Sequence, residues 1–233
     1  MLKDIDENIW VAEHPFRYLG LNVGTRMTVI RFTNNDLAVI SPIQADDAMI
    51  QQLNDLGCVK HIIAPNLFHH LFISDFKALY PDATLHASAE LMAKRPEIAI
   101  DKVLDDDTQK FNGELVYQLF AGFKTFLPSG IAPLNEYVFF HPTSQTLILT
   151  DTAFHFDESF PWTTQLVAKI IGGYKQLRPS RLERFATQAK EQVRQSVQTI
   201  LEWDFERVIV AHGSIVEHNA KQQFKDGYEW FLN

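Results

Sequence analysis

Short apolar runs rich in β-branched and aromatic residues open the chain and predict strands. Two such runs are Asn8–Ala12 and Met27–Phe32, and a third follows at residues 37–40. The segment Asn34-Asn35-Asp36 separates the second and third runs. These side chains favour turns because they tolerate left-handed backbone and bond to it locally. The pattern therefore predicts a hairpin near the start of the chain.

From about residue 46 the apolar spacing changes to that of a helix, which is predicted to end at Gly57. A buried-strand run follows at residues 59–64, then a helical stripe at 70–80 and a short strand at 83–86. Ser88 is placed to cap a further helix. The order strand, helix, strand indicates parallel pairing through right-handed crossovers.

The second half of the chain again places strands before helices. Strands are predicted at about 115–120, 137–140, 146–150 and 207–211, and helices at 162–171, 180–201 and from residue 216 to the end. The helix at 180–201 opens with a capping box, because Ser180 and Glu183 stand three residues apart. Two β-rich halves, each followed by helices, predict an α/β fold. The expected architecture is a four-layer αββα sandwich, formed as a single domain over residues 1–233.

Composition narrows the class of protein. Hydrophobic residues make up 46% and charged residues 21%, which is typical of a packed globular domain. The net charge of −8 argues against nucleic acid or an anionic membrane as the partner. The acidic start and the lack of any run of ~18 apolar residues indicate a cytoplasmic protein. One cysteine, Cys58, cannot build a disulfide framework and is predicted to be an inert buried thiol.

Candidate chemistry lies where predicted strands end. His69 and His70 follow the strand at 59–64, Asp151 follows the strand at 146–150, and His212 follows the strand at 207–211. The carboxyl ends of strands in α/β sheets gather ligands and catalytic groups. Imidazole and carboxylate groups suit zinc or iron, and two imidazoles with one carboxylate leave positions for water or substrate. Alternatively, each side chain satisfies only the loop backbone around it.

The order of elements resembles that of the metallo-β-lactamase superfamily. Its members have an N-terminal hairpin, a strand followed by T-H-x-H-x-D-H, a later strand ending in a bridging aspartate and a late strand ending in histidine. At the first motif this chain reads Ala64-Pro65-Asn66-Leu67-Phe68-His69-His70. His70 matches the final metal histidine and His69 stands at the metal aspartate, while Asp151 and His212 match the two later ligands.

The same alignment shows a degenerate motif, as in a divergent branch of the superfamily. Pro65 and Leu67 replace the first two histidines, and no histidine occurs from Ala87 to Phe140 to supply the third. This chain therefore lacks the histidines that form the first metal site in two-metal members of the superfamily. The second site keeps His70, Asp151 and His212, with His69 as a possible fourth donor.

The resemblance implies that His69, His70, Asp151 and His212 bind one divalent ion, with zinc the first expectation and iron or manganese the alternatives. It implies a mononuclear hydrolase of a small ester, lactone or related carbonyl substrate, in which His69 and Asp151 are catalytic. If His69 is not a ligand, it is expected to act as a base or proton donor. Two other interpretations stay open. One is a catalytically inactive protein that binds a small molecule or regulates a partner, and the other is a mononuclear iron oxidoreductase.

Overall fold

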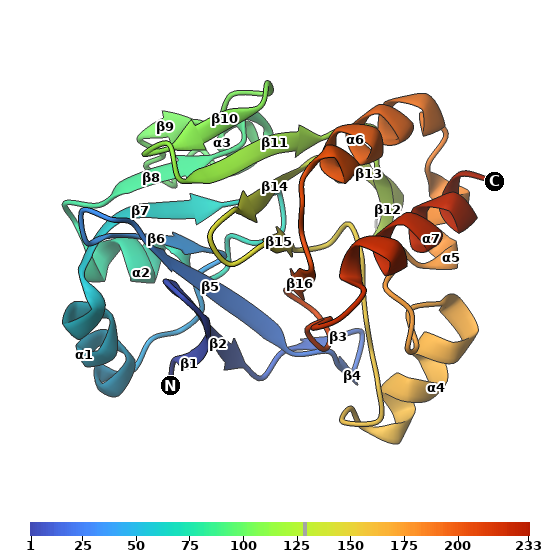
Figure 1. The fold of residues 1–233 in the computed structure, drawn as a ribbon, viewed down its shortest axis with the longest axis horizontal. Coiled ribbons are helices and arrows are strands. Elements are labelled where there is room, and N and C mark those ends of the chain that lie inside the picture. The colour runs from blue at the N-terminus through green and yellow to red at the C-terminus, as the bar shows by residue number, and fades with distance from the viewer. Residues whose placement is uncertain (128–129) are drawn as a thin grey trace.

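A computed structural model describes residues 1–127 and 130–233 (Figure 1). The first half of the chain forms a seven-stranded sheet in the order β1-β2-β5-β6-β7-β8-β9. Its first four strands pair antiparallel, and the pairs from β6 onward are parallel. The strands are β1 (Lys3–Asp6), β2 (Ile9–His14), β5 (Thr25–Arg31), β6 (Asp36–Ile40), β7 (Cys58–Ala64), β8 (Thr84–Ala87) and β9 (Lys102–Val103). The helices between its parallel strands are α1 (Asp47–Leu56), α2 (Ile73–Leu79) and α3 (Ala89–Lys94).

The second half forms a five-stranded sheet in the order β10-β11-β14-β15-β16, in which only β15 and β16 are parallel. The strands are β10 (Gln109–Phe111), β11 (Leu115–Phe120), β14 (Glu136–His141), β15 (Thr146–Leu149) and β16 (Arg207–Val210). The helices of this half are α4 (Trp162–Ile171), α5 (Arg181–Ala186), α6 (Lys190–Glu202) and α7 (Ala220–Leu232). Two small hairpins complete the fold: β3 (Arg17–Tyr18) with β4 (Leu21–Asn22), and β12 (Lys124–Leu127) with β13 (Gly130–Pro133).

Three hydrophobic clusters separate four layers. Successive side chains of a strand point to opposite faces of its sheet. In β5, Val29 therefore packs toward the helices of the first half, while Ile30 enters the cluster between the sheets. In β16, Val208 packs toward α6 and α7 and Ile209 faces the other sheet. In Figure 1 the two sheets lie between α1 and α2 on one side and α6 and α7 on the other. The expected αββα sandwich is confirmed.

Several local predictions differ from the structure. The helix predicted over 180–201 is two helices, because the chain leaves helical backbone at Thr187, whose hydroxyl accepts a hydrogen bond from the Lys124 amide. The helix predicted from residue 70 begins only at Ile73, after a turn. Cys58 is exposed rather than buried, since it is the first residue of β7. Within the residues described, no helix is long and apolar enough to cross a membrane.

The topology brings distant segments to one end of the two sheets. Because β15 and β16 are parallel neighbours, the residues that follow them, Asp151 and His212, emerge at the same edge of the second sheet. The loop after β7 reaches this edge from the first sheet, where Asn66 makes an isolated bridge to Glu136 of β14. This edge holds the candidate site.

Candidate metal centre

Asp151 is held by a buried scaffold directly after β15. Its backbone amide donates to Glu136 Oε2 at 2.6 Å, and the Thr150 amide donates to Glu136 Oε1 at 2.8 Å. The Asn66 side-chain amide donates to Asp151 Oδ2 at 2.8 Å and to Glu136 Oε2 at 3.2 Å. Asn66 and Glu136 have no exposed surface. Both therefore act as fixed supports that set the orientation of the Asp151 carboxylate.

His69 reaches Asp151 from the loop after β7. Asn66 Oδ1 accepts the amides of Phe68 at 2.8 Å and His69 at 3.0 Å, the local bonding by which asparagine turns a chain. His69 Nε2 lies 3.2 Å from Asp151 Oδ2, and its Nδ1 lies 2.5 Å from Ser41 Oγ. Ser41 follows β6 with φ +54°, a left-handed backbone that non-glycine residues rarely adopt outside constrained sites.

His212 completes the group from the end of β16. Its Nε2 lies 3.4 Å from Asp151 Oδ1, its Nδ1 lies 2.5 Å from the Gly24 carbonyl, and its ring stacks on Phe16 with centroids 5.8 Å apart. The Arg26 guanidinium contacts both sides of this turn, donating to the carbonyls of Val210 and Gly213.

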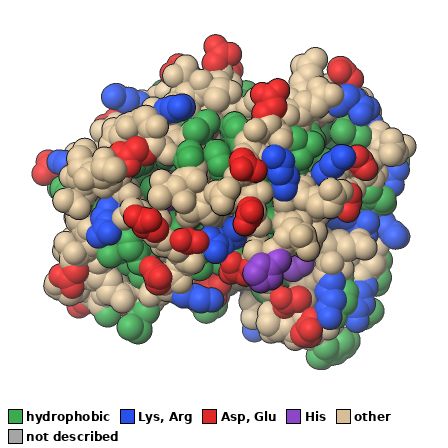
Figure 2. All heavy atoms as spheres, viewed as in Figure 1, with side chains coloured by type: hydrophobic (Ala, Val, Ile, Leu, Met, Phe, Trp, Pro, Cys, Tyr) green, Lys and Arg blue, Asp and Glu red, His purple; other side chains and the backbone are tan. Residues whose placement is uncertain are grey.

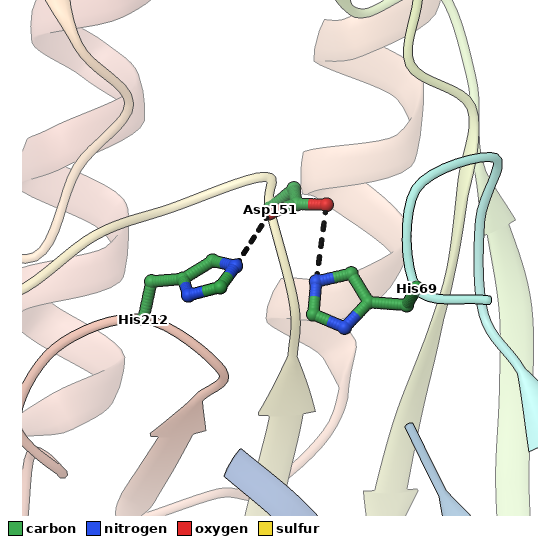
Figure 3. Close-up of side chains that lie close together, drawn as sticks. All are labelled: His69, Asp151 and His212. Atoms are coloured by element: carbon green, nitrogen blue, oxygen red, sulfur yellow. Dashed lines mark ion pairs between the residues drawn. The ribbon is translucent and has the colours of Figure 1, made fainter. Parts of the chain in front are cut away.

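Figure 3 shows the resulting arrangement, in which both histidine rings point at the Asp151 carboxylate, one at each oxygen. Donor atoms of His69, Asp151 and His212 all lie within 4.8 Å of one another. A carbonyl can only accept, so the Gly24 contact requires a hydrogen on His212 Nδ1. A neutral His212 then presents the lone pair of Nε2 to a carboxylate oxygen, which is favourable only when a proton or a cation lies between them. The donor set therefore fits a divalent metal ion.

The pKa values of Asp151, His69 and Glu136 depend on one another. Burial alone would raise the pKa of Asp151, but His69 and His212 together hold it well below its usual value. Burial alone would lower the pKa of His69, but Asp151 and the charge of Glu136 raise it. Glu136 has a raised pKa, first because of burial and then because of the nearby Asp151 charge. The centre thus carries a carboxylate charge that favours a cation.

His70 does not lie in this group, contrary to its expected place among the donors. Its Nδ1 lies 3.0 Å from a terminal guanidinium nitrogen of Arg95, the residue after α3. Burial and the charges of Arg95 and Lys94 lower the pKa of His70. The structure therefore brings together His69, Asp151 and His212, three of the four expected donors.

Sequence reasoning missed the supports of this centre. Asn66 and Ser41 stand in loops after predicted strands, a weak signal that many polar residues share. Glu136 precedes the strand predicted at 137–140, and an acidic residue there gives no sign that it is fully buried.

Comparisons with known proteins agree with the fold. A metallo-β-lactamase from Pontibacter korlensis superposes with a TM-score of 0.65 at 12% identity, covering 98% of each chain. The mono-zinc form of the metallo-β-lactamase FIM-1 from Pseudomonas aeruginosa gives 0.66 at 10% identity, covering 100% of this chain and 96% of the other. A metal-soaked flavodiiron core from Synechocystis gives 0.64 at 14% identity, covering 100% of this chain and 60% of the other.

No curated protein matches the sequence. The model of the family described as domain of unknown function DUF4336 matches residues 6–180. The chain has the metallo-β-lactamase fold and belongs to the DUF4336 family.

Proposed function

We propose that this protein is a metal-dependent hydrolase with a mononuclear centre, held by His69 Nε2, His212 Nε2 and the Asp151 carboxylate. The observation that carries the proposal is the pairing of both Nε2 atoms with Asp151, while each Nδ1 is engaged by a fixed partner. Metal-binding histidines in proteins show this arrangement, because the second ring nitrogen is hydrogen-bonded to fix the ring. Solved relatives with this fold include a metallo-β-lactamase in a mono-zinc form.

A bound divalent ion supplies Lewis acidity and lowers the pKa of water to about 7. The protein's own residues orient the donors. Asn66 occupies one face of Asp151 Oδ2, so the carboxylate can turn only its remaining lone pairs toward the ion. Ser41 and Gly24 hold the two rings, so both Nε2 atoms would stay directed toward a bound ion. Small esters, lactones and related carbonyl compounds are the substrates we propose.

Metal analysis of protein purified without chelator tests this proposal. We expect close to one equivalent of zinc, iron or manganese in the wild-type protein and in His70→Ala. His212→Ala and His69→Ala are expected to retain less than a tenth of an equivalent. His70→Ala is a matched control, because it removes an adjacent imidazole that contacts Arg95 instead of Asp151. A wild-type protein without metal, or equal loss in His70→Ala, would refute the proposed centre.

The same donor set favours a second candidate, a mononuclear iron oxidoreductase. Two imidazoles and one carboxylate are also the ligands of many non-haem iron sites, and one solved relative in fold is a flavodiiron core. Anaerobic purification followed by metal analysis and electronic spectroscopy separates the two. Zinc with esterase or lactonase activity supports the hydrolase. Iron with oxygen consumption, and no hydrolysis, supports the oxidoreductase.

A further inference from the structure

A cluster of positive charge lies on α5 and on the segment that precedes it. Between residues 169 and 190 the chain carries six basic side chains and one acid, although its net charge is −8. Arg178, Arg181 and Arg184 stand three residues apart, the first just before α5 and the other two on its first and fourth residues. Figure 2 shows Lys and Arg side chains along the edge of the molecule where Figure 1 places α5 and α7.

Within the described part of the chain, none of these three guanidinium groups forms an ion pair. Among residues 1–127 and 130–233, no carboxylate oxygen lies within 4.0 Å of any of them, whereas Arg26, Arg95, Arg194 and Arg207 all form ion pairs. The one acid of the segment, Glu183, is buried. Its Oε2 accepts from the amide and hydroxyl of Ser180, and its Oε1 accepts from the Thr125 hydroxyl at 3.0 Å. Glu183 therefore does not neutralise the cluster.

The indole of Trp230 on α7 contacts two of these guanidinium groups. Arg178 Cζ lies 4.2 Å and Arg184 Cζ 4.7 Å from the ring centroid, both within the range of cation–π attraction. Gly172 also lies close to this side chain, since a Cβ added there would be 3.3 Å from Arg178 Nε. The guanidinium is thus fixed in place by the fold, with less conformational freedom to lose when it binds a ligand.

Arg178 also carries an unmet hydrogen-bonding capacity. Its Nε is buried and has no acceptor in the part of the chain that the structure describes. Burial and the charges of Arg181 and Arg184 lower its pKa, which reflects how close the three like charges lie. Buried donors are normally satisfied, and repelling cations are normally paired. A bound anion would offset the repulsion among the three cations.

We propose that Arg178, Arg181 and Arg184, together with Trp230, form a binding site for a phosphoryl group. Guanidinium forks match the oxygens of phosphate in paired hydrogen bonds, and three positive charges suit a dianion. The source is either inorganic phosphate or a small phosphate monoester. This site shares no residue with the candidate metal centre, and the proposal does not rest on the proposed hydrolase activity.

Calorimetric titration with inorganic phosphate and, separately, phenyl phosphate tests the proposal. We use His212→Ala as the background, because phosphate can also bind a metal ion. Saturable binding is expected, and Arg178→Gln with Arg184→Gln should weaken it at least about tenfold, the loss expected when charge-assisted contacts are removed. Tighter binding of phenyl phosphate would identify a monoester as the ligand, and equal binding would identify phosphate.

Two further variants keep the outcome decisive. Arg181 is exposed, so Arg181→Gln should fold normally and still weaken binding several-fold. Lys221→Gln and Lys225→Gln remove two positive charges from α7, where these lysines face Asp204 and Glu229, and should leave the affinity unchanged. Equal loss in that control, unchanged binding in the arginine variants, or heats reproduced by chloride at matched ionic strength would overturn the proposal.

Discussion

The ring of His212 is oriented by a residue from the opposite sheet: its Nδ1 donates to the carbonyl of Gly24 over 2.5 Å. Gly24 directly precedes β5, while His212 follows β16. This contact fixes which nitrogen carries the hydrogen and leaves Nε2 to face Asp151. The candidate metal centre is therefore assembled across the interface between the sheets, and its geometry depends on how closely their ends are joined.

Arg26 is a second contact between the start of β5 and the segment after β16. Its replacement should leave the His212 ring less firmly oriented. Its guanidinium donates to the carbonyls of Val210 and Gly213, and its Nη2 lies 2.7 Å from Glu13 Oε1. A lysine presents one compact charge and cannot reproduce this fork. We expect Arg26→Lys to lower metal affinity by about 10–100-fold, the usual effect of losing an outer support. Competition with a chromophoric chelator measures this loss.

Arg31→Lys provides the matched control for that measurement. Arg31 lies on the same strand, but its guanidinium donates to Asn8 Oδ1, at the other end of β5. This substitution should leave metal affinity within about twofold. If both variants lose affinity equally, the effect comes from β5 as a whole, and Arg26 has no specific role in orienting His212.

The Ser41 hydroxyl should have a comparable role for His69. Ser41→Ala removes the partner 2.5 Å from His69 Nδ1 without adding volume, so we expect metal affinity to fall by about tenfold. Ser88→Ala is the control, because this buried serine caps α3 through the Leu91 amide. It should cost about 1 kcal/mol of stability with no change in metal affinity. Unaltered affinity in Ser41→Ala would show that the contact does not support the ligand.

Periodicity was enough to predict the sandwich, because buried strands and amphipathic helices have different apolar spacings. The early hairpin, the parallel pairing of β7 with β8, and α4 all lie where the pattern placed them. The small hairpins β3–β4 and β12–β13 were not predicted. They are short, and each of their residues is exposed or only partly buried, so they carry no burial pattern.

Which of two adjacent histidines enters the centre could not be predicted. His69 and His70 follow the same strand, and the choice depends on side-chain contacts made by distant segments. Asn66 turns the chain so that His69 faces Asp151, and Arg95 lies beside His70 on the other side. No local pattern encodes either contact. The position of His69 beside Asp151 is therefore known only from the structure.

Acid should destabilise the metal-free protein through His86, a buried histidine that contacts the half-buried His61. His86 Nε2 lies 3.1 Å from His61 Nδ1. Burial, then the charges of His61 and Lys102, lower the pKa of His86 to about 4, against the opposing charge of Asp101. Unfolded histidine has a pKa of about 6.5, so between these values the unfolded chain binds the extra proton. The free energy of unfolding therefore decreases as the pH is lowered through this window, by up to about 1.4 kcal/mol per pH unit from this residue.

Urea unfolding at pH 7.5 and pH 5 measures that dependence. His86→Gln removes the titrating group and should reduce the difference between the two free energies by about 1 kcal/mol or more. His218→Gln replaces an exposed histidine and should leave the difference as it is in the wild-type protein. An equal reduction in both variants would contradict the assignment to His86.

The hydroxyl of Tyr228 should stabilise the segment that follows Asp151. On α7, this buried group donates to the Thr152 carbonyl at 2.7 Å, one residue after Asp151. Tyr228→Phe leaves that carbonyl without its donor and should cost about 1–3 kcal/mol. In a protein of this size each kcal/mol lowers the melting temperature by about 2–4 °C, which calorimetry resolves. Tyr80→Phe is the control, since its exposed hydroxyl lies 3.5 Å from Asn54 Oδ1 and should contribute less than about 0.5 kcal/mol.

Because Asp151 is also fixed by Asn66 and Glu136, Tyr228→Phe should keep its metal. Loss of metal from Tyr228→Phe would show instead that α7 helps to hold the carboxylate in place.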